Sequence, residues 1–258
     1  MYSEELKTKG LNKFALQIIA VLAMLIDHLA VFVYNTPYYY IMKFIGRITI
    51  IIMCYFVAEG FYKTHNLGKY ITRMGIFAVV SQIPYYLYLY RGQLLENPKG
   101  LIMSAFTNRN VIFTLFVGLC LLAIIKSNYK AWLKVIATLA SLYLVRNSDW
   151  SYYGVLWVIC FGLIRDNKAK QMLWAAIILI IKIAPEVWPA VSSVIVAKSL
   201  TYGMLDLLVM FGGFLALPLL SAYNGSRGKN MKLGLYIFYP VHLIVIVAVM
   251  IILRQYGA

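Results

Sequence analysis

Long apolar segments, separated by short polar or basic ones, follow one another along almost the whole chain. A helix needs about 20 apolar residues to cross the hydrocarbon core of a bilayer. On that criterion we predict nine spanning helices, over residues 14–34, 41–62, 69–90, 108–126, 131–146, 151–165, 171–185, 201–221 and 231–254. The three between 131 and 185 are short for a crossing and would be tilted or incomplete. Residues 187–200 would form a tenth helix, re-entrant or interfacial, as the alternative.

The lysines and arginines predict the orientation of these helices. With the N-terminus in the cytoplasm, fifteen of the 24 basic residues fall on the inner side, three in each of 7–13, 63–73, 126–134, 165–170 and 227–232. Such a bias is typical of cytoplasmic loops, whereas clustered tyrosines such as those in "TPYYYIMK" favour the outer interface. The N-terminus is therefore expected in the cytoplasm. The C-terminus would be outside with nine spans and inside with ten.

The composition excludes a water-soluble protein. The chain is 62% hydrophobic and 13% charged, against about 45–50% apolar and about 25% charged in soluble domains. We therefore predict an all-α, polytopic helical bundle that spans an inner or plasma membrane, with the lipid bilayer as its first partner. Because there is no linker, repeat or low-complexity tract, residues 1–258 are expected to form a single domain. The net charge of +15 is spread between apolar segments, which argues against nucleic-acid binding.

Several polar side chains fall inside the predicted spans, where a charge costs about 2.5–3.5 kcal/mol and usually has a function. At about 1.5 Å per residue, His28 of "LIDHL" and Arg47 both lie roughly 9 Å below the outer surface. The other polar residues in the outer half are Asp27, Gln82, Asn110, Thr114 and Asp206. Asp149 lies in a short outer turn, and His242 lies nearer the midplane of the last span. Together they predict a polar pocket that opens outward.

Structural explanations compete with this functional one. Asp27 and Arg47 would then form a buried ion pair, and His28 would be a packed histidine with satisfied hydrogen bonds. His242 follows Pro240 closely, so its imidazole would bond backbone carbonyls that the proline leaves free. An acid beside an imidazole nevertheless favours proton transfer, because the carboxylate stabilises the protonated ring.

A second polar set lies on the inner side of the predicted spans. It comprises Glu59, Asn224 and Arg227, with Lys229 beside them. Glu59 would either face a partner or reach toward the interface. The segment "YNGSRG" over 223–228 would be either a simple turn, as Asn-Gly indicates, or a loop that holds phosphates through backbone N–H groups and Arg227.

The familiar catalytic motifs are missing from the sequence. There is no GxSxG, HExxH or Walker motif, and the three histidines, His28, His65 and His242, lie at different depths, so we expect no metal. The three cysteines lie in apolar segments without CxxC spacing, which makes disulfides improbable. What remains is an acid–base pair with a nearby arginine. Such a set suits group transfer, in which an amine or hydroxyl loses a proton while an oxyanion is stabilised.

Seven segments, in order along the chain, resemble the TraX family. They are "LIDHL", "GRITIIIMCYFVAEGFYKTHN", "YITRMGIFAVVSQIPY", "NVIFTLFVGL", "YYGVL", "LPLLSAYNGSRG" and "FYPVHL". The resemblance implies a role in conjugation systems, where the family's namesake is needed for N-terminal acetylation of pilin. It also implies a distant similarity to acyltransferase-3 and heparan-glucosaminide acetyltransferase membrane enzymes. Their pattern of a basic residue, ten residues and a histidine falls on Gln17 and His28, and Gln17 departs from it.

The resemblance implies an acetyltransferase that uses cytosolic acetyl-CoA as acyl donor and needs no metal. The acceptor would be an exported amine, such as the N-terminus of pilin or of another peptide. His28 would be the general base, with Asp27, Arg47 and Asn110 as its catalytic partners. Substrate binding is assigned to Gln82, Asp149, Asp206, Tyr239 and His242, and cofactor binding to Glu59, Asn224, Arg227 and Lys229.

Two other classes of function stay open at this point. One is a proton-coupled transporter or channel, in which Asp27, His28 and Arg47 would relay protons. The other is a non-catalytic membrane scaffold of a conjugation or secretion system, which would bind no CoA.

Overall fold

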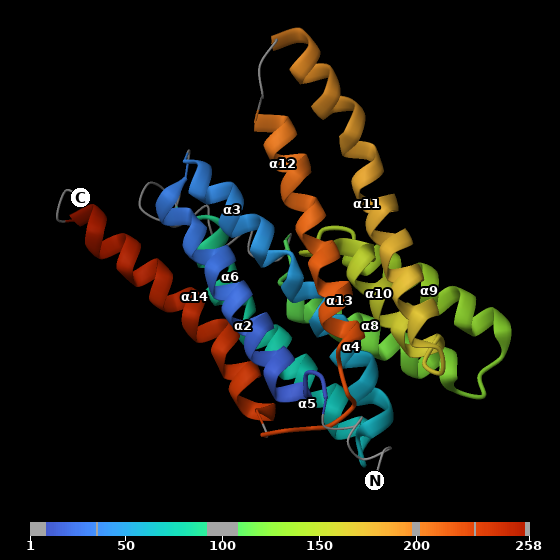
Figure 1. Ribbon diagram of the computed structural model, residues 1–258. Coiled ribbons are helices and arrows are strands. Elements are labelled where there is room, and N and C mark those ends of the chain that lie inside the picture. Colours follow the sequence, from blue (N-terminus) through green and yellow to red (C-terminus); the bar gives the residue numbers. More distant parts are fainter. Residues whose placement is uncertain (1–8, 35, 92–107, 198–201, 230, 256–258) are drawn as a thin grey trace. The chain divides into compact units, whose positions relative to one another are not determined.

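The computed structural model describes residues 9–34, 36–91, 108–197, 202–229 and 231–255 (Figure 1). Within these ranges nearly all of the chain is helical, and the extended pairings are two isolated bridges, Leu11 with Tyr223 and Arg109 with Ser148. The predicted all-α class is confirmed.

The chain divides into two compact units, which are described separately. Unit 1 comprises residues 1–56 and 163–231, and unit 2 comprises residues 57–162 and 232–258. The division passes through helix α4 (Ile48–Lys63), so that each unit holds about half of it. The single domain expected from the sequence stays a prediction.

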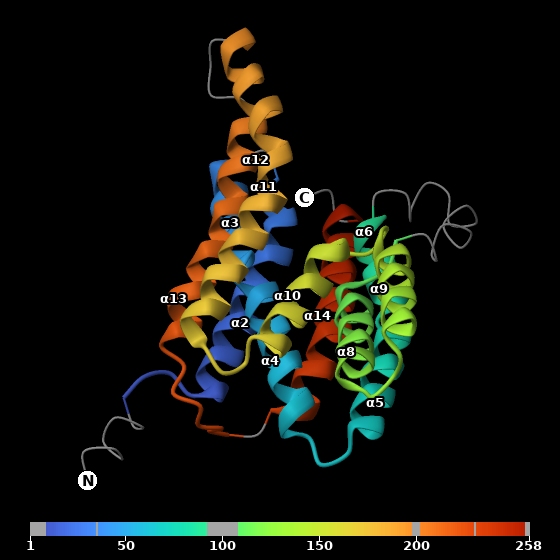
Figure 2. The ribbon, with the colours of Figure 1, turned by 90° about the vertical axis from the view of Figure 1, so that its right-hand side faces the viewer.

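Unit 1 is built from helices of both ends of its sequence. In addition to the first half of α4 these are α2 (Lys13–Leu29), η1 (Ala30–Val33), α3 (Pro37–Gly46), α11 (Lys168–Ala197), α12 (Tyr202–Phe211), η3 (Gly212–Leu215) and α13 (Ala216–Ser221). Helix α3 packs against both α2 and α12, and α11 runs beside α12 (Figure 2).

Local chemistry explains where these helices begin and how closely they pack. The Asn12 side chain accepts a hydrogen bond from the Ala15 amide at 2.8 Å, which caps α2. Pro37 occupies the first turn of α3, where its missing N–H costs nothing. Gly212 lies so close to the Phe44 carbonyl that a Cβ there would collide with it. The backbones of α3 and η3 are therefore in direct contact.

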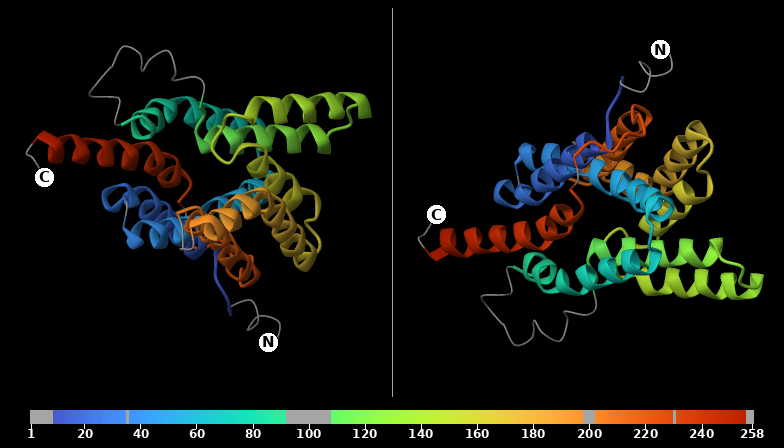
Figure 3. Two further views of the ribbon diagram at one scale, coloured as in Figure 1. Left: turned by 90° about the horizontal axis from the view of Figure 1, so that it is seen from above. Right: turned by 90° about the horizontal axis from the view of Figure 1, so that it is seen from below.

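The hydrophobic core of unit 2 is built around helix α8. Its helices, besides the second half of α4, are α5 (Leu67–Val80), α6 (Gln82–Leu89), α8 (Val111–Lys126), α9 (Ala131–Val145), α10 (Ser151–Leu163) and α14 (Lys232–Gln255). Helix α8 packs against α5 and α9, and α14 packs against α6 (Figure 3). Val117, Leu121, Val145 and Val155 form the buried centre.

Five helical stretches are long and apolar enough to cross a membrane. Among the described residues these are Lys13–Val33, Pro37–Lys63, Lys168–Ser192, Gly203–Ser221 and Gly234–Arg254. Three shorter apolar helices, Val111–Lys126, Ala131–Val145 and Ser151–Leu163, coincide with predicted spans. The fold is thus that of a membrane helical protein, whereas the predicted count of nine or ten crossings stays a prediction.

Two element predictions were wrong in detail. Helix α11 continues from Lys168 to Ala197 through Pro185 and Pro189, so 171–185 and 187–200 are not separate helices, although residues 198–200 lie outside the described part. The predicted span 69–90 is divided at Ser81 into α5 and α6. Proline is tolerated inside membrane helices because neighbouring groups satisfy the freed carbonyl, so α11 continues through both prolines.

Candidate functional site

The end of α2 holds the predicted acid–base pair, Asp27 and His28. The Asp27 Oδ2 accepts a hydrogen bond from Lys43 Nζ at 3.0 Å, and both side chains are less than one-fifth exposed. The Asp27 Oδ1 is buried and has no hydrogen-bond partner among the described residues. It lies against Gly46, where a Cβ would collide with the carboxylate. His28 is half-buried in the last turn of α2.

The ion-pair partner of Asp27 is not the one expected from the sequence. The sequence offered Arg47, whereas the structure pairs Asp27 with Lys43, one turn earlier. The reason is that α3 begins at Pro37 rather than at residue 41, so Lys43 lies well inside the helix. Counting depth from residue 41 had placed this lysine at the surface.

Arg47 belongs to the same part of unit 1 but faces another acid. It follows α3 and interacts electrostatically with Asp206 of α12, which is also near Glu186 of α11. Tyr39 lies close to both Asp206 and Arg47. The helices α2, α3, α11 and α12 therefore bring together Asp27, Lys43, Arg47, Glu186 and Asp206, which we name the charge cluster.

Lys182 is a further charged residue beside this cluster. Its Nζ lies 3.9 Å from Met210 Sδ, one turn of α12 beyond Asp206, and the side chain is half-buried. Sequence reasoning missed Lys182 and Lys43 as site residues because basic residues were used there only to set orientation. A lysine within an apolar segment was the available signal.

The segment 222–229 follows α13 and is held by the residues before α2. We name it the basic loop. The Leu11 amide donates to the Ala222 carbonyl at 2.8 Å, and the Asn224 amide donates to the Leu11 carbonyl at 2.9 Å. The Lys13 amide donates to the Ser226 carbonyl at 2.9 Å. These bonds give the loop a fixed shape.

Side chains of the basic loop divide between structural and exposed ones. Asn224 Oδ1 accepts hydrogen bonds from the Ser226 amide and hydroxyl, at 3.0 and 2.7 Å, so this side chain builds the turn. Gly225 and Gly228 have positive φ angles of 81° and 63°. Arg227 and Lys229 point outward and are exposed. Of the predicted cofactor-binding residues, these two offer charges to an anion.

Two lysines from other segments lie beside the basic loop. Lys168 Nζ donates to the Ser221 and Tyr223 carbonyls, both at 2.7 Å, and so caps the end of α13. Lys13 Nζ lies 4.8 Å from the centre of the Phe56 ring, which itself contacts Tyr223 edge-on. The loop therefore lies in a basic environment drawn from three segments of unit 1.

Glu59 was the fourth residue predicted to bind the cofactor. It belongs to unit 2, and its Oε1 accepts a hydrogen bond from Lys63 at 2.8 Å within α4. Glu59 was predicted to bind the cofactor together with Asn224, Arg227 and Lys229, but these three belong to unit 1. The structure describes no geometry that joins the four.

In unit 2 the predicted residues Asn110 and Gln82 form a buried amide network. Asn110 Nδ2 donates to the Ala78 carbonyl at 2.7 Å and to Gln82 Oε1 at 2.8 Å, and its Oδ1 accepts from the Phe113 amide at 3.2 Å. Gln82 Nε2 donates to the Asn108 carbonyl at 2.7 Å. Asn110 thus caps α8, and both of its N–H bonds are engaged.

The other predicted residues of unit 2 lie around the buried Tyr239. The Asp149 carbonyl accepts a hydrogen bond from Thr114 Oγ1 at 2.7 Å, and the Tyr239 hydroxyl interacts electrostatically with Asp149. His242 stacks on Phe238 with ring centres 4.6 Å apart, and its Nδ1 donates to the Phe238 carbonyl at 2.7 Å. His242 therefore bonds a carbonyl of its own helix, but this is the Phe238 carbonyl and not the Tyr236 carbonyl that Pro240 leaves free.

The predicted site residues consequently form two groups. In unit 1, Asp27, Arg47 and Asp206 belong to the charge cluster, and His28 follows Asp27 in the chain. In unit 2, Gln82 hydrogen-bonds Asn110. Tyr239 of the same unit contacts the His242 ring and interacts electrostatically with Asp149. Among the described residues, no three His, Cys, Asp or Glu side chains gather in a way that would hold a metal ion. The roles assigned to the individual residues stay predictions.

Comparisons with known proteins agree with the resemblance seen in the sequence. The family model described as TraX protein matches residues 13–250. The chain is 28% identical over 240 residues to the probable fimbrial assembly protein FimC, serogroup H1, of Dichelobacter nodosus, covering 90% of this chain and 93% of that protein. It is 29% identical over 105 residues to the uncharacterized protein RP591 of Rickettsia prowazekii (strain Madrid E), covering 41% and 34%. No solved structure matches the chain.

Proposed function

The chain belongs to the TraX family, and on that premise we propose that it is a membrane acetyltransferase. It would transfer an acetyl group from cytosolic acetyl-CoA to an amine of an exported acceptor. The relative named for fimbrial assembly supports a peptide acceptor, and we propose the N-terminal amine of a pilin-like protein. The observation that carries the proposal is the charge cluster of unit 1, beside an imidazole at the end of α2.

We propose the topology that the basic residues favour. Nine crossings in an inner or plasma membrane, with the N-terminus in the cytoplasm, put the basic loop on the cytoplasmic side. They put the charge cluster in the outer half of the membrane. Acetyl-CoA and an exported amine would then approach the protein from opposite sides.

His28 is the proposed general base. The nitrogen of the neutral acceptor amine attacks the acetyl carbonyl carbon and forms the C–N bond, while the imidazole takes a proton from that nitrogen. The carbonyl electron pair moves to oxygen, and the Arg47 guanidinium stabilises that oxyanion. The C–S bond then breaks, and the CoA thiolate takes the proton back from the imidazolium.

Asp27 acts as a positioning residue in this scheme. Neighbouring residues on a helix do not face each other, so the scheme includes no hydrogen bond from the His28 ring N–H to the Asp27 carboxylate. Instead, the ion pair with Lys43 fixes α3, and with it Arg47, against α2. Asp206, with Glu186 nearby, supplies negative charge that attracts the acceptor as an ammonium ion, which loses one proton to solvent before the neutral amine attacks.

The basic loop is the proposed contact for the phosphates of CoA. Arg227 and Lys229 are exposed on a loop of fixed shape, and Lys13 and Lys168 add positive charge nearby. A phosphate prefers an arginine fork and clustered positive charge. The residues present therefore fit the anionic end of the donor.

The first test is the acetylation of a peptide by the purified protein in liposomes. Labelled acetyl-CoA is supplied with a peptide that has a free N-terminus, and incorporation into the peptide is measured. We expect His28→Ala to lower the rate by about 100-fold or more, the usual contribution of a general base. His65→Ala is the matched control, because His65 is an exposed histidine of the same chain, and it should keep full activity. Unchanged transfer by His28→Ala would refute the assignment.

Proton-coupled transport is the second candidate, favoured by charged residues contributed by four helices. Ionisable residues inside a membrane often belong to proton relays, and Lys182 adds one beside the charge cluster. A pH-sensitive dye inside the liposomes separates the two functions. Transport predicts proton flux without acetyl-CoA, whereas the acetyltransferase predicts none.

A further inference from the structure

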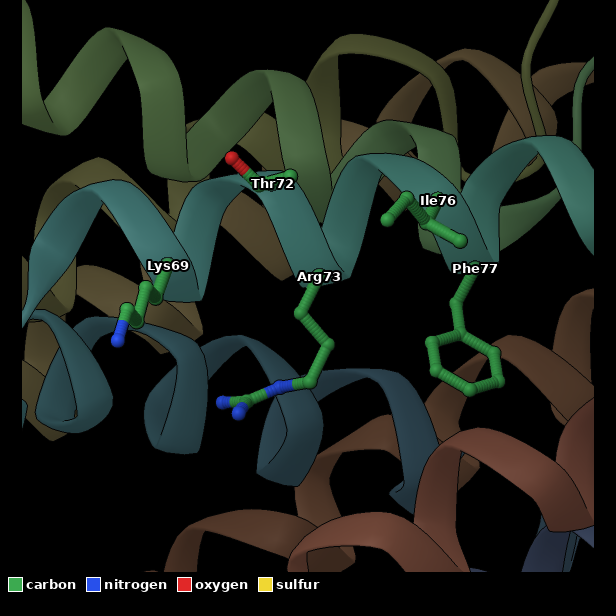
Figure 4. A pocket seen from close by; sticks show the side chains of 5 residues that line it. All are labelled: Lys69, Thr72, Arg73, Ile76 and Phe77. Carbon is green, nitrogen blue, oxygen red and sulfur yellow. The ribbon is translucent and has the colours of Figure 1, made fainter.

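A hollow of about 300 Å³ runs along α5 in unit 2 (Figure 4). It is lined by Lys69, Thr72, Arg73, Ile76 and Phe77. Lys69, Arg73 and Phe77 follow one another at four-residue spacing and point to one side of the helix. Two cations and a hydroxyl therefore occupy one end of the hollow, and apolar side chains occupy the other.

Arg73 is held in place by aromatic rings rather than by a carboxylate. Its guanidinium carbon lies 5.7 Å from the centre of the Tyr70 ring and 5.4 Å from that of Tyr236, in the range of cation–π contacts. Its Nε is buried and has no hydrogen-bond partner among the described residues. The described ion pairs involve neither Arg73 nor Lys69. The Tyr236 side chain hydrogen-bonds the guanidinium, so one of its donors, the Nε, is left without an acceptor, and an anion in the hollow would add a partner for the positive charge.

The apolar end of the hollow continues into an exposed apolar stripe. Ile76, Val79, Val80 and Ile83 are 56%, 75%, 53% and 70% exposed along α5 and the start of α6. In a membrane protein such a face lies against acyl chains. The hollow therefore connects two cations that could bind one phosphate, Lys69 and Arg73, to an apolar surface that could bind an acyl chain.

We propose that this hollow binds one anionic phospholipid, with its phosphate on Lys69 and Arg73 and an acyl chain along Ile76 and Val80. Charge complementarity favours this occupant, because clustered basic residues at the cytoplasmic interface attract anionic headgroups. The adjoining stripe favours a lipid over CoA, since CoA carries no long hydrocarbon chain. The inference rests on the proposed membrane position of α5 and not on acetyl transfer.

The test compares two lipids that differ only in headgroup. The full-length protein in a neutral detergent is mixed with phosphatidylglycerol or phosphatidylcholine of the same chains. Retained lipid is counted by native mass spectrometry, and the melting temperature is measured in parallel. We expect phosphatidylglycerol to be retained and to raise the melting temperature more than phosphatidylcholine, because a ligand that binds the folded state stabilises it.

Variants of the two cations make the test specific to the hollow. Arg73→Gln and Lys69→Gln should each remove more than half of the difference between the two lipids, and Arg73→Lys should restore part of it. Lys126→Gln is the matched control, because Lys126 is an exposed lysine at the end of another helix of unit 2. If Arg73→Gln does not fold, the exposed Lys69 still carries the test.

Three outcomes would overturn the lipid site. One is an equal lipid preference in Lys69→Gln and in the Lys126→Gln control. Another is no difference between the two lipids in the unmodified protein. The third is displacement of the retained lipid by soluble CoA at the same positions, which would assign the cations to the acyl donor instead. None of these results bears on the His28 test.

Discussion

At the scale of single residues, the contact between Asp27, Lys43 and Gly46 determines how α2 meets α3. A glycine lets the carboxylate approach the α3 backbone, and a lysine from the preceding turn neutralises it. A charge buried in this way is tolerated only while its partner stays in place. The contact therefore supports the position of Arg47, which directly follows Gly46.

Lys43→Met is expected to lower the free energy of unfolding by about 3 kcal/mol, because it leaves the Asp27 carboxylate buried without its counter-ion. Chemical or thermal denaturation in detergent measures the loss. The double variant Asp27→Leu with Lys43→Met serves as control, since it removes both charges and should be more stable than the single variant. Equal stability of Lys43→Met and the unmodified protein would show that the pair contributes nothing.

Gly46→Ala is expected to separate α2 from α3, because the added Cβ would collide with the Asp27 carboxylate. The loss of acetyl transfer should exceed what the fall in melting temperature explains, since Arg47 moves with α3. Gly234→Ala offers a comparison, because a Cβ at Gly234 meets no neighbouring atom. A Gly46→Ala protein with normal activity would contradict the positioning role.

At the scale of elements, the basic loop shows how backbone geometry prepares a binding surface. Three backbone hydrogen bonds tie it to Leu11 and to Lys13, the first residue of α2, and Asn224 closes its turn. Its two glycines adopt a conformation that other residues rarely take. The shape of the loop is therefore fixed by its backbone and by Asn224, so the charges of Arg227 and Lys229 stay available to a ligand.

Substituting the two glycines of the basic loop one at a time distinguishes the cost of backbone strain from the cost of a steric collision. Gly225→Ala should cost about 1–2 kcal/mol, the penalty of the left-handed conformation alone, because no atom lies within 4 Å of the added Cβ. Gly228→Ala should cost more, because its Cβ would also lie 2.8 Å from that of Phe14. Melting temperature and CoA affinity, measured together, check this order. A smaller effect at Gly228 than at Gly225 would contradict the described packing.

The helices themselves could be predicted from the sequence, but not where some of them break. Apolar length and basic flanks located the centres of α2, α8 and α14, because burial in lipid is the dominant requirement. Separate helices were predicted over 171–185 and 187–200, whereas α11 is continuous through both Pro185 and Pro189. Asn110 was predicted to be catalytic because its depth in the membrane could be estimated from the sequence, whereas its role as the N-cap of α8 could not. A cap and a catalytic amide look alike until their hydrogen bonds are known.

At the scale of the whole molecule, the proposed topology is the framework for every assignment. It makes the ends of α8 and α9 alternate between the two sides of the membrane. Asn128 would then be cytoplasmic and Asn147 would be outside, and both side chains are exposed. The two positions offer a matched pair for labelling.

Asn128→Cys and Asn147→Cys, each made in a chain whose three cysteines are replaced, should react from opposite sides. A membrane-impermeant maleimide added to intact cells is expected to label Cys at position 147 and not at position 128. After the cells are opened, both should react. Labelling of both positions in intact cells would contradict the proposed crossings between them.

The site could be predicted only in part for a physical reason. Depth along the chain located Asp27, Arg47 and Asp206 in one layer, and the structure brings these three into one unit. It did not identify Lys43 and Lys182, because pairing depends on which helices pack together. That choice is a property of the tertiary structure: a lysine inside an apolar segment can be seen in the sequence, but its partner cannot.

The most direct test of the central claim is acetyl transfer across a sealed membrane. Labelled acetyl-CoA is enclosed on the cytoplasmic side of oriented liposomes, and an acceptor peptide is added outside. The account predicts label on the N-terminus of the external peptide, and none when His28 is replaced by alanine. Label on the external peptide only when acetyl-CoA is also outside, or no transfer at all, would contradict it.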